Sequence, residues 1–160
     1  MFDQILGLPA HPLIIHFAVV LTPLFVAVAA GYALLPRWRP YLAWAVVLLA
    51  LAAPAAVYTA KESGESLKAA RFATAEGELG ARITTHQSFA NPLLLSVLGL
   101  TAVALLLVFA TRPSRESVGR DRFGRAVTLA LSGLTLALAA VAGYYVFQAG
   151  DSGARAVWGV

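Results

Sequence analysis

Four long apolar stretches constrain this chain more than any other feature. They run from about 12 to 35, 41 to 59, 89 to 111 and 127 to 147. A helix needs roughly 20 apolar residues to cross the hydrocarbon core of a bilayer. Open strands would leave backbone N–H and C=O groups unpaired in lipid, so we expect the stretches to be helices. The predicted fold class is therefore all-α, a four-helix transmembrane bundle in which residues 1–160 form one transmembrane domain.

The composition agrees with a bilayer as the main partner. Of the 160 residues, 59% are hydrophobic and 12% are charged, whereas soluble domains have about 45–50% and about 25%. The chain has no cysteine, which excludes disulfides, thiolate metal sites and a cysteine nucleophile. The residues before the first stretch include Asp3 and no Lys or Arg, so we do not expect a cleaved signal peptide there. No internal repeat is evident.

The basic residues indicate an orientation in the membrane. Seven of the 12 Lys and Arg residues lie in the connections after the first and third stretches: Arg37, Arg39, Arg112, Arg115, Arg120, Arg122 and Arg125. Basic connections stay on the cytoplasmic side. The prediction is an inner-membrane protein with both termini outside, together with the longer connection of residues 60–85, where a short surface helix could form. Because this bias explains the net charge of +4, nucleic-acid binding is not expected.

Three histidines are predicted to lie on the outer side. His11 and His16 open the first stretch, and His86 opens the third. An ionisable residue inside a span is costly and usually faces the bundle interior. His16 lies roughly 6 Å deeper than Pro12 at the helical rise per residue, so the prediction pairs His16 with His86. His11 would be a third ligand or proton partner, or a helix cap, because a residue before proline avoids the α region.

Several kinds of histidine chemistry are open. Two imidazoles on different helices could bind haem b iron from opposite sides. Three histidines could hold Cu or Zn, with Glu62 nearby. A histidine could exchange protons with a quinol. Alternatively, the histidines only bond backbone, water or headgroups. The chain has no CxxCH, HExxH, phosphate-binding loop or nucleophile elbow, so we expect at most an electron-transfer component and no hydrolytic or transferase activity.

The first stretch carries a specific motif. It reads His-Pro-Leu-x-x-His-Phe, and the third stretch begins with a histidine, as the chain shows at His11, Pro12, Leu13, His16, Phe17 and His86. Together with the Gly-rich end "AGYYVFQAGDSGARAVWGV", this resembles a bacterial family of four-span predicted membrane proteins of unknown function. The chain departs from that pattern at Ala18, where the family has proline, and at Thr59-Ala60, where it has Thr-Gly.

The resemblance also implies a functional setting. Members of that family are found joined to cytochrome c or Rieske-type domains, which implies electron transfer with a redox partner or with other subunits of a membrane complex. It therefore favours haem b. The alternative is a non-catalytic accessory or anchor subunit without a cofactor, and a Cu- or Zn-binding membrane protein comes third. Close contacts of glycine and alanine would also allow a homo-oligomer.

Overall fold

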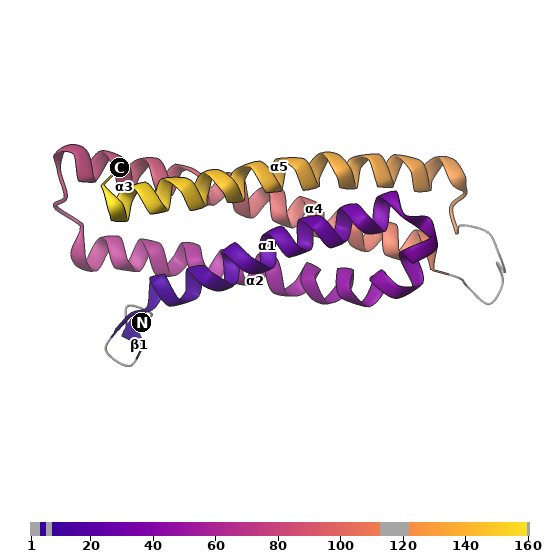
Figure 1. Ribbon diagram of the computed structural model, residues 1–160, viewed down its shortest axis with the longest axis horizontal. Helices are drawn as coiled ribbons and strands as arrows, with labels where there is room; N and C mark the ends of the chain where they lie inside the picture. The colour runs from indigo at the N-terminus through magenta and orange to yellow at the C-terminus, as the bar shows by residue number, and fades with distance from the viewer. Residues whose placement is uncertain (1–3, 6–7, 113–121, 160) are drawn as a thin grey trace.

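Long antiparallel helices dominate the computed structural model, which describes residues 4–5, 8–112 and 122–159 (Figure 1). Arg115 and Arg120, expected on the cytoplasmic side, lie outside these residues. The long helices are α1 (Ala10–Leu34), α2 (Arg39–Arg71), α4 (Ala90–Thr111) and α5 (Arg125–Trp158). The short elements are the helix α3 (Gly77–Ser88), the 3₁₀ turn η1 (Pro36–Trp38) and an antiparallel pair of two-residue strands, β1 (Gln4–Ile5) and β2 (Leu8–Pro9).

The predicted all-α fold is confirmed, and the described residues contain four helical segments long and apolar enough to cross a membrane. Two helices extend well beyond the apolar stretches that predicted them. α2 continues to Arg71 and α5 to Trp158. The extra turns of α2 are rich in Ala, Lys, Glu and Arg, which favour a helix without being apolar. Those of α5 contain two glycines, an Asp and a Ser, and they are tied to α3 by hydrogen bonds at Ser152 and Arg155. Hydropathy therefore located the spans but not the helix ends, and α2 and α3 replace most of the expected loop.

The four long helices surround a common core. α1 packs against α2 and α5, and α4 packs against the same two helices, so that α1 and α4 are diagonal neighbours. α3 lies against α5 and the start of α4. α1 begins and α5 ends at one end of the bundle, at the left in Figure 1, which we call the terminal end. η1 lies at the opposite end, which we call the loop end.

The buried side chains of α1 and α4 form two stripes with the same spacing. Intervals of four, three, four and three residues place such a stripe on one helix face. The stripes are Ala18, Thr22, Phe25, Ala29 and Tyr32 in α1, and Leu93, Val97, Leu100, Ala104 and Leu107 in α4. Seven residues before the first member of each stripe stands a histidine, His11 or His86. Both histidines are therefore in register with the core.

The burial pattern is also shared by α2 and α5, the helices that follow α1 and α4 in the chain. Buried Ala50, Ala53 and Ser63 of α2 correspond to buried Ala139, Ala142 and Ser152 of α5. The expectation of no internal repeat is thus corrected: the hairpin of α1 and α2 is repeated by α4 and α5. The repeat is hard to see along the chain because most core residues differ between the halves and only the burial pattern is shared.

Arg39 joins two helices at the loop end. Its Nε donates to the carbonyl of Tyr32 at 3.1 Å, and its Nη2 donates to Ala33 O at 3.5 Å and to Ser132 Oγ at 3.4 Å. The last carbonyls of a helix have no partner within the helix, so this guanidinium satisfies the end of α1 and connects it to α5.

We expect Arg39→Gln to lower the free energy of unfolding by about 1–3 kcal/mol, because buried or half-buried carbonyls lose a charged donor. Thermal unfolding in detergent measures the effect. Arg37→Gln is the matched control, since Arg37 lies in η1 two residues away and is exposed. Equal shifts for the two variants would contradict a capping role for Arg39.

Candidate cofactor site

Two histidines meet at the terminal end of the bundle. His11 comes from the first turn of α1 and His86 from the last turn of α3. Both are half-buried. Their ring centroids are 6.4 Å apart and their planes are inclined by 68°. Two residues separated by 75 positions in the chain are thus brought into a T-shaped ring pair.

Ser63 of α2 determines which nitrogen of His11 carries the proton. The Nδ1 atom of His11 lies 3.0 Å from Ser63 Oγ, and this hydroxyl donates to the carbonyl of Ala60 at 2.9 Å. A hydroxyl has a single proton to donate, so Ser63 accepts the proton of Nδ1–H. In the neutral ring Nε2 then carries the lone pair, which is the form that binds a metal.

Ser152 of α5 makes the corresponding hydrogen bond with the ring of His86. The Nδ1 atom of His86 lies 3.2 Å from Ser152 Oγ. That hydroxyl donates to the carbonyls of Gln148 at 2.7 Å and Ala149 at 3.2 Å. The two halves of the repeat therefore present two imidazoles in the same tautomer, each oriented by a fully or nearly buried serine.

A glycine lies against each imidazole. A Cβ atom added at Gly64 would lie 3.0 Å from Cε1 of His11, and one added at Gly153 would lie 3.0 Å from Cε1 of His86. Contacts that short are tighter than ordinary packing, so each ring rests on bare helix backbone. The glycines allow α2 and α5 to approach the histidines closely.

The serines and glycines were missed at the level of sequence, although a signal exists. The segments "AKESG" and "AGDSG", residues 60–64 and 149–153, share alanine, an acidic residue, serine and glycine in the same order. Each segment follows an apolar stretch that returns to the terminal end. A comparison of the second stretch with the fourth would have revealed the pair.

The structure does not bring His16 to His86. His16 is exposed, and its Nδ1 atom contacts the carbonyl of Pro12 in its own helix. Five residues along a helix turn the side chain by about 140°, so His16 points away from the stripe that contains His11. The alternative that His11 is a helix cap is also corrected, because α1 begins at Ala10 and His11 lies inside its first turn. The position of a histidine in the sequence predicts its depth in the membrane but not the face of the helix on which it lies.

The donors of this site suit a ligand held by two nitrogens. Among the described residues, no three side chains of His, Asp or Glu converge on a common point, as a Cu or Zn site of three histidines would require. Glu62, considered as an additional ligand, accepts a hydrogen bond from Lys61 instead. What remains is a T-shaped pair of imidazoles whose Nδ1 atoms contact the two serines.

A family model described as "Predicted membrane protein (DUF2231)" matches residues 7–160. The chain belongs to this family. The match confirms the resemblance seen in the first helix, and it agrees with the four apolar helices. No curated protein and no solved structure matches the chain.

The matched region contains the entire candidate site of this family member. Both histidines, both serines and both glycines lie within residues 7–160. The family description says that the protein belongs in a membrane, and it assigns no chemistry. The chemistry must therefore be argued from the site.

Proposed function

We propose that this membrane protein is an electron-transfer subunit that holds a haem b between His11 and His86. The observation that carries the proposal is the opposed pair of imidazoles, whose ring centroids are 6.4 Å apart. The pair would supply two nitrogen donors from different helices to a haem iron.

The residues of the chain have separate tasks in this proposal. His11 and His86 would hold the haem iron. Ser63 and Ser152 hold the two Nδ1 protons and fix the planes of the rings, which is a usual way to orient a metal ligand. Haem b, when bound, supplies an iron that accepts and releases one electron. By the positive-inside rule, the basic connections at the loop end favour an outer location for the site, where a redox partner could approach.

The first test is an absorption spectrum of the protein purified in detergent from haem-replete cells, before and after dithionite. A Soret band, with sharp α and β bands after reduction, is expected. A featureless spectrum would overturn the haem proposal and favour an accessory or anchor subunit. Copper or zinc found by elemental analysis, without a Soret band, would instead support the metal-binding alternative.

We expect Ser63→Ala and Ser152→Ala to keep the haem but to hold it about 10-fold less tightly or worse, as is typical when a hydrogen-bond partner of a metal ligand is lost. Haem transfer to apomyoglobin measures the retention, and a redox titration should show a changed midpoint potential. Ser88→Ala is the control, since Ser88 is exposed and donates to Thr85 O of its own helix. Unchanged retention in all three variants would contradict a positioning role.

A further inference from the structure

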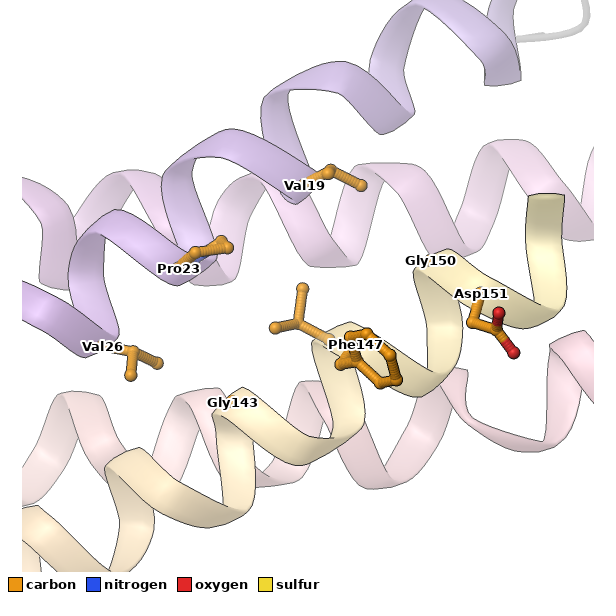
Figure 2. Close-up of a pocket in the computed structure, with 8 residues that line it drawn as sticks. Val19, Pro23, Val26, Gly143, Phe147, Gly150 and Asp151 are labelled. Carbon is orange, nitrogen blue, oxygen red and sulfur yellow. The ribbon is translucent and has the colours of Figure 1, made fainter.

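A groove of about 540 Å³ lies between α1 and α5. Figure 2 shows Val19, Pro23 and Val26 of α1 facing Phe147 of α5 across it. Both walls belong to helices that are apolar enough to span a membrane. A ligand would therefore reach the groove from the lipid, and its volume is within the range of about 300–1,000 Å³ that is typical of small-molecule sites.

Missing side chains on α5 create the hollow. A Cβ atom added at Gly150 would meet no atom within 4 Å. In the other half of the repeat, the position of Gly150 is occupied by Lys61, whose Nζ lies 2.7 Å from Glu65. One half of the molecule thus carries a long side chain where the other half leaves a space.

One end of this apolar groove is polar. Asp151 lines it there, as Figure 2 shows. The Oδ2 atom of Asp151 accepts a hydrogen bond from Arg155 Nε at 2.8 Å, and a carboxylate can accept several hydrogen bonds at once. Asp151 directly precedes Ser152, which bonds His86. The polar end of the groove is therefore one residue along α5 from the serine that bonds His86.

We propose that this groove binds a lipid-soluble quinol, with a ring hydroxyl donating to the carboxylate of Asp151 and the apolar tail lying along Val19, Pro23 and Val26. A quinol combines an apolar body with hydroxyl donors, which is the combination that the walls and the carboxylate require. Bilayer lipid is the competing occupant, because an acyl chain would fill the apolar part and a headgroup donor would bond the carboxylate from outside the groove. As a source of electrons, the quinol has a role here only if the proposed function is correct.

Binding can be measured with a benzoquinol that carries a diazirine on a ten-carbon tail, using the purified protein in lipid nanodiscs without oxygen. We expect saturable binding and, after illumination, labels on residues 19–26 and 143–151. Gly150→Leu should weaken binding about tenfold or more, because the new side chain fills the groove. Gly133→Leu is the matched control, since Gly133 lies on the same helix and its Cβ would also meet no atom within 4 Å.

Asp151→Ala is the second variant and should also weaken binding. Arg155→Ala removes the same ion pair but keeps the carboxylate, so it should bind like the wild type. Labels spread evenly over the lipid-facing helices, or wild-type binding by Gly150→Leu, would overturn the inference and leave bilayer lipid as the occupant.

The absorption spectrum of the same samples separates the two proposals. Haem in the wild type and in Gly150→Leu, without groove labelling in either, would remove the quinol site and leave the proposed function intact. Saturable labelling of the groove in a protein without haem would remove the proposed function and leave the quinol site intact.

Discussion

His11→Ala and His86→Ala should each abolish the low-spin haem spectrum, whereas His16→Ala should leave it unchanged. Each of the first two changes removes one of the opposed imidazoles, whose centroids are 6.4 Å apart. His16 is exposed and its ring contacts the carbonyl of Pro12 in its own helix, so it is the matched control. The measurement is the reduced-minus-oxidised spectrum together with the haem content per protein.

A ligand exchange distinguishes loss of a haem ligand from loss of the fold. His86→Met retains a side chain that can bind iron, and His/Met ligation raises the reduction potential relative to two histidines. We expect His86→Met to keep haem at a higher potential. Loss of haem in His16→Ala, with full retention in His11→Ala, would show that the ligand pair predicted from the sequence alone was the correct one.

Gly64→Val and Gly153→Val should each cause a large loss of haem, which is the second large effect that we expect. A Cβ at either position would already lie 3.0 Å from Cε1 of the neighbouring histidine, and the branched valine adds two more carbons. The ring must then move out of its hydrogen bond with serine, because overpacked sites respond by shifting side chains off their rotamers. Haem content is the measurement, with helix content by circular dichroism as the check on folding.

Gly133→Val provides the control for these glycine substitutions. It introduces the same residue into a helix with the same intrinsic cost, but a Cβ at Gly133 would meet no atom within 4 Å. It should retain haem like the wild type. Equal retention by Gly64→Val and Gly133→Val would show that contact between glycine and histidine does not shape the site.

Hydropathy was sufficient to predict the helices and the membrane as their environment. Each of the four apolar stretches is a helix, since lipid leaves the backbone no other way to satisfy its hydrogen bonds. The ends of α2 and α5 could not be predicted in this way, because the residues that follow both apolar stretches are polar or mixed. Helix propensity favours the last turns of α2, whereas hydrogen bonds to α3 at Ser152 and Arg155 hold those of α5. The family resemblance also followed from the first helix and was confirmed over residues 7–160.

The sequence alone also determined that the histidines are grouped at one end, because helices that cross a bilayer in alternate directions return to the same side. Only the tertiary structure decided that His11, and not His16, faces His86. The physical reason is that depth along a helix and direction around its axis are independent, and only packing against α2 and α5 selects the direction. The same packing brought Ser63 and Ser152 to the two rings from 52 and 66 residues away in the chain.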